Sequence, residues 1–417
     1  MTRTPLRPDR VVNAVAAAVF LQFSGATAVL PMLPLFLRNQ HTSVGLIGVV
    51  MAAFFAAGVF TQYAAGHLSD RIGHRRVMVG GLVIYAVASL GFLLSVGAGG
   101  YIGLRALQGL GAGALQLAGL ALVAVVIPLE RRGRAFSKVF AAQVAGMAIG
   151  PVFGSAVGLA HVKWLFIVSA VCAVAAMVPM MARTGGLRPP APSSELAPLR
   201  LSRGLVGVVV VGVVGGLTAG VYEACWTLLM TSRGAAQWQV GLSWTMFAVA
   251  FAAVSPFAGR LADRLDRRWL AGAACLVSAS FIVVYAGLPD PWLLMALGVF
   301  EALGVAISFP AAQSLLSQLA SEDALGRAQG VFTTAESGAM AVGAAASGYL
   351  FGVHAWLPFV TAGVVAALLT ATLPSLWRDV IGHAAEAAQS SAIESRAPVA
   401  PPPRPVAAAA AAAAAEG

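Results

Sequence analysis

The sequence GHLSDRIGHRR, residues 66–76, follows directly on a long apolar run. A closely similar sequence, GRLADRLDRR, occupies residues 259–268 and also follows an apolar run. In both places an aspartate and a cluster of arginines end a hydrophobic stretch that is long enough to cross a bilayer. The repetition indicates two related halves, each of which crosses a membrane several times.

The composition supports a membrane protein. Of the 417 residues, 59% are hydrophobic and only 10% are charged, whereas a soluble domain carries about 25% charged residues. The net charge of +10 could suggest a nucleic-acid partner. The basic residues lie between apolar runs, however, which is the membrane pattern and excludes a nucleic-acid-binding face.

Twelve stretches are long and apolar enough to cross a bilayer as helices. They are residues 11–37, 43–65, 76–97, 100–127, 135–160, 163–182, 204–230, 238–258, 269–288, 291–317, 327–352 and 355–375. An even number of crossings puts both termini on one side of the membrane. All but four of the 26 Lys and Arg residues then lie on that side, the exceptions being Arg38, Arg105, Lys163 and Arg233. Because positively charged loops stay in the cytoplasm, we expect a multi-pass protein of the cell membrane (the inner membrane if the cell has two) with both termini cytoplasmic.

The chain divides into four parts by composition. Residues 1–183 form a first group of six spans and residues 204–376 a second, separated by a proline- and serine-rich cytoplasmic linker at 184–203. Residues 377–417 are rich in alanine and proline, and we expect a disordered cytoplasmic tail. No cysteine, histidine or carboxylate spacing predicts a disulfide, a metal site or another cofactor.

The two halves align at one offset of 193 residues. This offset matches Asp70 with Asp263, and it matches Gly133-Arg134-Ala135 with Gly326-Arg327-Ala328. Polar landmarks that repeat in this way indicate two parallel repeats about an axis along the membrane normal. The predicted fold is therefore all-α, with twelve transmembrane helices in two pseudo-symmetric six-helix bundles.

Residues 66–76 resemble the loop signature between the second and third spans of the major facilitator superfamily, and the resemblance extends over residues 10–376. Three further stretches are similar to signatures of its twelve-span drug/proton antiporters. These are FSGATAVLPMLP in span one, with Gly25, Pro31 and Pro34; RALQGLGAG in span four, with Arg105, Gln108, Gly109 and Gly111; and GMAIGPVFG in span five, with Gly146, Gly150, Pro151 and Gly154. The chain departs from the pattern at His74, where an arginine is usual, and at Ala344, which stands opposite Pro151 in the second half.

The resemblance implies a clasp between the two halves on the cytoplasmic side. Asp70 would face the start of span eleven near Arg327, and Asp263 would face span five near Arg134, because a carboxylate is stabilised by a helix N-terminus and a guanidinium. The residues concerned are Gly66, Asp70, Arg71, Gly73, Arg75, Asp263, Arg264 and Arg327. The alternative is a solvated loop whose arginines only set the topology.

Four ionisable residues lie inside predicted spans: Arg105, Glu223, Glu301 and Glu336. Each is costly in lipid and should face protein or a water-filled cavity. The resemblance implies that spans one, four, seven and ten line a central cavity, which predicts proton-coupling or cavity roles for the first three. The 193-residue offset pairs Glu301 with Gln108, one turn beyond Arg105, so we expect Glu301 and Arg105 at similar depth. For Glu336 we expect a structural hydrogen bond. The alternatives are interhelical bonding for Arg105, a headgroup position for Glu223, and cation binding or a bridge between two helices for Glu301.

These features predict a secondary active transporter and not an enzyme. We expect a monomer that exports small, largely apolar compounds by alternating access, with protons as the driving ion and membrane lipid around it. A lipid flippase, an uptake system or facilitator for a metabolite, and a non-transporting receptor remain as alternatives.

Overall fold

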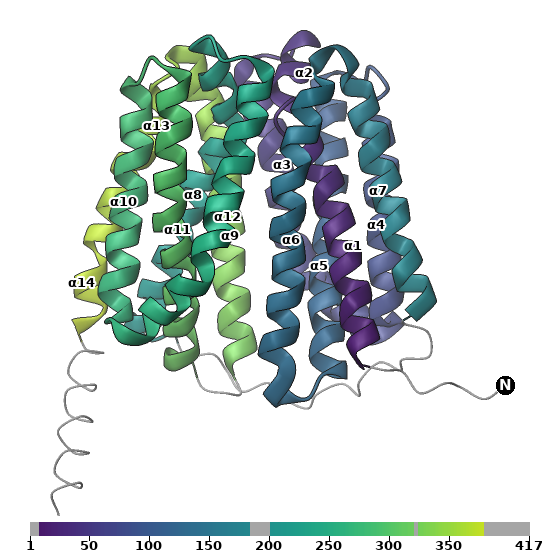
Figure 1. The fold of residues 1–417 in the computed structure, drawn as a ribbon, viewed down its shortest axis with the longest axis vertical. Helices are drawn as coiled ribbons and strands as arrows, with labels where there is room; N and C mark the ends of the chain where they lie inside the picture. The colour runs from purple at the N-terminus through teal and green to yellow at the C-terminus, as the bar shows by residue number, and fades with distance from the viewer. Residues whose placement is uncertain (1–7, 184–200, 321–323, 379–417) are drawn as a thin grey trace, which may run out of the picture. The chain divides into compact units, whose positions relative to one another are not determined.

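The computed structural model describes residues 8–183, 201–320 and 324–378, and its helices belong to one compact unit that ends at Leu376. The described residues of the first half form α1 (Pro8–Val29), α2 (Leu33–Asn39), α3 (Val44–Ile72), α4 (His74–Gly91), α5 (Gly97–Val126), α6 (Leu129–Val157), a 3-10 turn (Leu159–His161) and α7 (Val162–Arg183) (Figure 1). Those of the second half form α8 (Arg203–Ser232), α9 (Gln237–Arg264), α10 (Arg267–Gly287), α11 (Pro291–Leu319), α12 (Leu325–Val353), α13 (Leu357–Ala371) and α14 (Leu373–Leu376).

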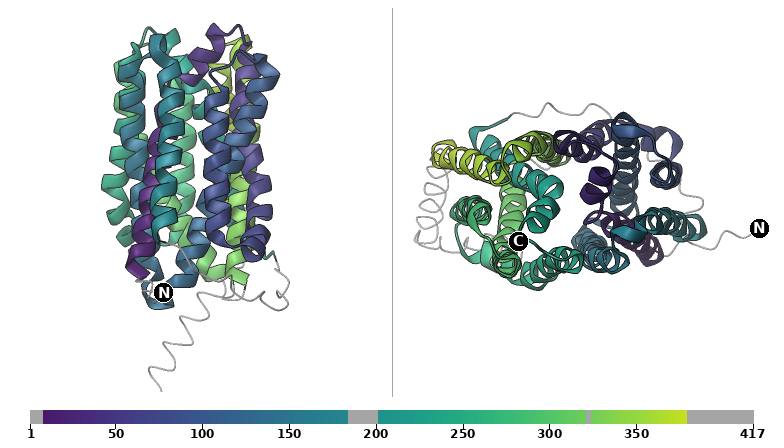
Figure 2. Two further views of the ribbon diagram at one scale, coloured as in Figure 1. Left: turned by 90° about the vertical axis from the view of Figure 1, so that its right-hand side faces the viewer. Right: turned by 90° about the horizontal axis from the view of Figure 1, so that it is seen from above.

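The helices cross the unit twelve times, as the sequence predicts. Within the described ranges, ten helical stretches are long and apolar enough to span a membrane, and α4 and α12 run beside them (Figures 1 and 2). The pairs α1–α2 and α13–α14 each make one crossing. We call the edge that holds Pro8, Gly73 and Leu376 the terminal edge, and the edge that holds Asn39 and Gly158 the opposite edge.

The first crossing is broken, whereas the sequence predicted one continuous span over residues 11–37. Helix α1 ends at Val29, a turn follows, and α2 begins at Leu33. Pro31 lies in that turn and Pro34 in the first turn of α2. Proline has no N–H and fits best at the start of a helix or in a turn, so these two prolines are compatible with the division of the span.

The helix bounds follow the offset found in the sequence. Adding 193 to the bounds of α3 gives 237–265, and the same shift of α5 gives 290–319. The helices found there are α9, Gln237–Arg264, and α11, Pro291–Leu319. The two halves are thus repeats in structure as well as in sequence.

The turn after the second crossing of each half is built differently in the two repeats. Gly73 has a φ of 91° between α3 and α4, a backbone conformation that favours glycine. Asp266 takes its place before α10 and accepts a hydrogen bond of 3.0 Å from the backbone N–H of Arg268. The Arg268 guanidinium, 2.7 Å from the carboxylate, holds the pKa of Asp266 below its usual range. A helix cap and an ion pair therefore replace the glycine turn.

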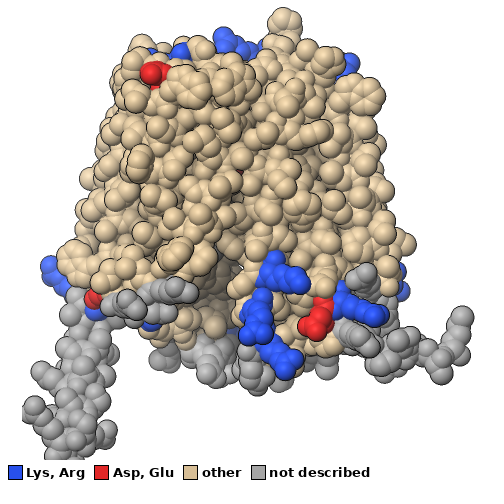
Figure 3. Space-filling model, in the orientation of Figure 1, with Lys and Arg blue, Asp and Glu red and all other residues tan. Residues whose placement is uncertain are grey.

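On the face shown in Figure 3, surface charge lies at the two edges. In Figure 3 the Lys, Arg, Asp and Glu side chains of the visible face gather along its upper and lower margins and leave an uncharged band between them. Between the two edges, exposed side chains are apolar, for example Phe60, Val87 and Val171. A surface of this kind faces lipid, because lipid offers charged groups no solvation.

The buried apolar residues show where the halves are joined. The cluster near the opposite edge combines both halves, with Phe36 and Ile47 from the first and Trp226 and Tyr285 from the second. The buried cluster near the terminal edge contains residues 11–180 only, all from the first half. The halves therefore share a core at the opposite edge.

Two helix pairs join the halves. Helix α3 packs on α12, and α6 on α9. A Cβ at Gly48 of α3 would lie 2.8 Å from the Cα of Gly348 of α12, near the opposite edge. Nearer the terminal edge, Cβ atoms at Gly326, Gly330 and Gly338 of α12 would meet no atom of the described residues within 4 Å. The structure is thus the state that is closed at the opposite edge.

Candidate functional site

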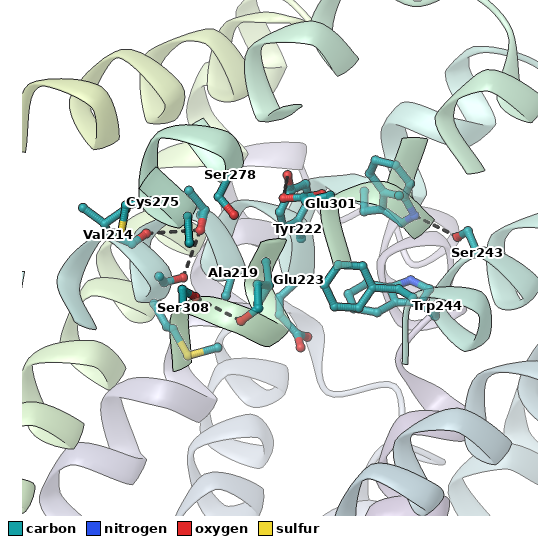
Figure 4. Close-up of a pocket in the computed structure, with 18 of the residues that line it drawn as sticks. Val214, Ala219, Tyr222, Glu223, Ser243, Trp244, Cys275, Ser278, Glu301 and Ser308 are labelled. Carbon is teal, nitrogen blue, oxygen red and sulfur yellow. Dashed lines mark hydrogen bonds between the residues drawn. The ribbon is translucent and has the colours of Figure 1, made fainter. Parts of the chain in front are cut away.

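A cavity of about 280 Å³ lies among α8, α9, α10 and α11, with Met147 of α6 and Met340 of α12 at its margin (Figure 4). Most of its wall is apolar. The polar lining residues are Thr218, Tyr222, Glu223, Trp226, Ser243, Trp244, Ser278, Glu301 and Ser308. Apolar walls with a few placed polar groups are typical of small-molecule sites.

Glu301 of α11 is the most enclosed of these groups, with only 3% of the residue exposed. Its Oε1 accepts a hydrogen bond of 2.7 Å from the Tyr222 hydroxyl of α8. Its Oε2 accepts one of 2.9 Å from the Tyr285 hydroxyl of α10. A buried carboxylate is costly unless it is hydrogen-bonded, and two tyrosines meet that requirement. One side chain thereby connects three helices.

Aromatic rings pack around this carboxylate. Trp226 of α8 lies 5.2 Å from Tyr285 and 5.8 Å from Tyr222 between ring centroids, in edge-to-face arrangements. Its indole N–H donates a hydrogen bond of 2.9 Å to Ser243 Oγ of α9. Edge-to-face aromatic pairs add stability beyond burial, so this group of rings fixes the position of Glu301.

Glu223 of α8 also lines the cavity, which replaces the headgroup position that the sequence left open. In Figure 4 its carboxylate points away from Glu301 and Tyr222. No hydrogen bond or salt bridge joins it to another residue that the structure describes. Its charge interacts with that of Arg105 at longer range.

Arg105 of α5 is buried, with 7% exposed. Its Nη1 donates to Gln108 Oε1 at 3.2 Å, and Gln108 Nε2 donates to Ser89 Oγ at 2.9 Å. The guanidinium carbon lies 4.6 Å from the centre of the Phe54 ring, a cation–π contact. Arg105 is not among the residues that line the cavity, and its pairing with Glu301 stays a prediction.

The glycines of α6, the fifth span, allow close packing against α1 in the first span. Cβ atoms at Gly146 and Gly150 of α6 would lie 2.8 Å from Phe20 O and 2.7 Å from Ser24 O, both in α1. Gly154 approaches Ala28 of α1 in the same way. These glycines therefore admit the backbone of α1.

Helix α9, which is the eighth span, contacts another face of α6. A Cβ at Gly241 of α9 would approach Pro151 O and Ser155, and Thr245 Oγ1 donates a hydrogen bond of 2.6 Å to Ala148 O. Pro151 lies inside α6 and cannot donate to Met147 O. Because Gly241 of α9 approaches its carbonyl, Pro151 lies at the junction of the two halves. Met147, one turn earlier in α6, lines the cavity.

The remaining motif residues are placed as follows. Gly25 of α1 packs on α7, where a Cβ would lie 2.7 Å from Cys172 Cβ. Arg71 is exposed and Arg75 partly buried beside the Gly73 turn. The guanidinium of Arg327 has no hydrogen-bond partner among the described residues. Gly66 lies in α3. The side chains of Asp70, Asp263 and Arg264 lie outside the described residues, so the clasp stays a prediction.

The described helices make twelve crossings in two repeats, with an apolar cavity among helices of the second repeat, and this architecture is typical of a membrane transporter. The sequence profile of the Major Facilitator Superfamily matches residues 15–222 and again residues 204–415. The chain belongs to this superfamily, as its signatures predicted.

Two curated relatives and one solved structure illustrate the kinship. Multidrug resistance protein 2 of Bacillus subtilis (strain 168) is 30% identical over 160 residues, which cover 38% of this chain and only 40% of that protein. Tetracycline resistance protein, class E, of Escherichia coli is 26% identical over 351 residues, 78% of this chain and 84% of that protein. A POT family transporter, crystallised in complex with 5-aminolevulinic acid, superposes with a TM-score of 0.74 at 12% identity, covering 88% of this chain and 96% of that one. The last shows the fold alone.

Proposed function

We propose that this transporter exports small, largely apolar compounds in exchange for protons. The observation that carries the proposal is the cavity itself, whose apolar wall encloses two carboxyl groups, Glu223 and Glu301. An apolar wall suits an apolar substrate. A carboxyl group in such surroundings takes up a proton more readily than one in water. The names of the two curated relatives, which concern multidrug and tetracycline resistance, agree with export.

Glu301 is the proposed proton-carrying group. Its two tyrosine partners lie on α8 and α10, so a rearrangement of these helices changes how well the charged carboxylate is stabilised. Hydrogen bonds to the charged form favour proton release, and their loss favours proton uptake. Glu223 and Arg105 assist because their charges interact across the two halves.

The proton gradient supplies enough free energy for concentration of substrate. One proton that enters across 100 mV and one pH unit releases about 2.3 and about 1.4 kcal/mol, which supports a substrate gradient of a few hundredfold.

The proposed orientation places the terminal edge in the cytoplasm. The arginines and lysines of this chain concentrate on the loops of that edge, and cytoplasmic loops are enriched in these residues. The structure, closed at the opposite edge, then corresponds to the state from which cytoplasmic substrate is loaded. We propose a monomer as the working unit, since each chain carries its own cavity.

The test uses purified protein in proteoliposomes with an acidic interior. Tetracycline, ethidium and a fluorescent headgroup-labelled phospholipid are offered outside, and internal pH is followed with a trapped dye. The proposal predicts that a drug accumulates inside while protons leave. Drug entry that ignores the pH gradient would indicate a facilitator instead, and movement of the phospholipid alone would indicate a flippase.

A further inference from the structure

Helix α6 carries three exposed basic side chains in a row at the terminal edge. They are Arg131, Arg134 and Lys138, and their spacing of three and four residues puts them on one face of the helix. We call them the basic row. In Figure 3 basic side chains gather at the lower margin over the lower end of α6, with uncharged surface directly above them.

No salt bridge joins the basic row to a carboxylate of the described residues. Lys138 Nζ donates a hydrogen bond of 2.7 Å to Asn13 Oδ1 of α1, which is a neutral acceptor. Asp9, one turn before Asn13 in α1, is exposed and likewise has no salt bridge to a described residue. The row therefore presents positive charge to its surroundings.

The same face of α6 becomes apolar toward the middle of the unit. The residues that continue the spacing of three or four are Ala141, Ala145, Ile149 and Val152, and all are exposed. From Lys138 to Ile149 the helix rises about 16 Å, which is close to half of the hydrocarbon thickness of about 30 Å. The glycines that meet α1 and the residues that meet α9 lie on other faces of α6, so this face is left to the lipid.

We propose that this face of α6 binds an anionic phospholipid of the leaflet that borders the terminal edge. The phosphate of the headgroup lies at the basic row, where guanidinium and ammonium groups donate to its oxygens. One acyl chain lies along Ala141, Ala145 and Ile149, which offer an apolar surface of matching length. Charge and apolar surface thus follow one another along the helix in the same order as along the lipid.

Basic residues at this edge also set the topology, but topology requires neither one particular helix face nor exposed apolar residues that continue it. Since Lys138 reaches α1, a headgroup bound at the row holds the ends of α1 and α6 together. None of the residues of this face lines the cavity. The inference therefore does not rest on the proposed export.

The experiment measures lipid binding to the purified full-length protein by native mass spectrometry. The probes are dioleoyl phosphatidylglycerol, which is anionic, and dioleoyl phosphatidylcholine, which has no net charge, with glycerol 3-phosphate as a soluble competitor. The test variant combines Arg131→Gln with Lys138→Gln. Arg134 stays unchanged, because it lies one turn from Glu130 and near the predicted contact of Asp263.

Two control variants are matched to the test variant. Arg76→Gln combined with Arg378→Gln removes the same charge from exposed side chains elsewhere at the terminal edge. Arg131→Lys combined with Lys138→Arg keeps the charge of the basic row.

The parent should bind phosphatidylglycerol at least about tenfold more tightly than phosphatidylcholine. Each basic residue removed from the row should weaken phosphatidylglycerol binding about fivefold, so the test variant should lose about 25-fold. Both control variants should bind it as the parent does.

Three results would overturn the inference. Equal binding of the two lipids would show that this face of α6 is an ordinary lipid-facing surface. Equal losses in the test variant and in the variant at Arg76 and Arg378 would show that only the net charge of the edge matters. Displacement of phosphatidylglycerol by glycerol 3-phosphate at a comparable concentration would show that the row binds a soluble phosphate compound and not a lipid.

Discussion

Replacement of Gly150 by alanine tests how α6 is seated against α1. The added Cβ would lie 2.7 Å from Ser24 O and 2.8 Å from Ala28 N, and it would also meet Thr27 Oγ1. The distance from the added Cβ to Ser24 O is 0.7 Å shorter than 3.4 Å, the shortest ordinary van der Waals contact. Two of the three neighbours are backbone atoms of a helix, which cannot rotate away, so the helices must move apart.

The expected cost follows from this displacement. A gap of 0.5–1 Å forfeits a quarter to a half of each contact along the interface, and overpacking of this kind costs about 1–3 kcal/mol. We expect Gly150→Ala to lower the thermal midpoint of the purified protein in detergent by a few degrees. The reaction of buried Cys225 and Cys275 with a thiol-specific fluorophore reports unfolding. Gly150→Leu should in addition uncouple transport or make the protein leak.

The matched control is Gly338→Ala in α12, the counterpart of α6 in the second repeat. A Cβ there would meet nothing within 4 Å, and alanine favours a helix over glycine by up to about 1 kcal/mol. This variant should be as stable as the parent or more so. Equal midpoints for the two variants would refute the close packing of α6 on α1.

Two further predictions concern the carboxylates of the protein. Tyr285→Phe removes one hydrogen-bond donor to the Glu301 carboxylate. Because that donor favours the charged form, the midpoint of the pH profile of transport should move up by about one unit. An unchanged profile would show that this tyrosine does not act on the proton site. Asp70→Asn should leave the protein folded but slow transport. If the clasp holds the terminal edge closed, crosslinking between the ends of α3 and α12 at that edge should also fall. Normal transport and crosslinking would show that residues 66–76 only set the topology.

The sequence was sufficient for the fold because the fold depends on length and hydropathy. Each crossing is a run of apolar residues, and the offset of 193 survives in the bounds of α9 and α11. The break in the first crossing was not predicted, although Pro31 and Pro34 were visible. Prolines within apolar runs can kink a helix or end it, and only the packing of α2 decides between them.

The site was predicted less completely. Glu223 and Glu301 were identified because charged residues are rare in apolar spans, and both line the cavity. Tyr285 was missed, since α10 was not expected to contribute to the cavity and a tyrosine in a span is unremarkable. Trp244 was missed as well, because whether an indole N–H is paired depends on the helix opposite. The glycine spacing of span five indicated that a helix approaches closely, but it could not show which helix.

The central claim, proton coupling through Glu301, is tested most directly by Glu301→Gln in proteoliposomes. The amide keeps the shape of the side chain but cannot carry the proton. The account predicts that this variant loses accumulation of drug driven by a pH gradient, yet still exchanges labelled for unlabelled drug at equal pH on both sides. Glu336→Gln, outside the cavity lining, should retain both activities. If Glu301→Gln still concentrates drug against its gradient at the full rate, Glu301 does not carry the proton and the account is contradicted.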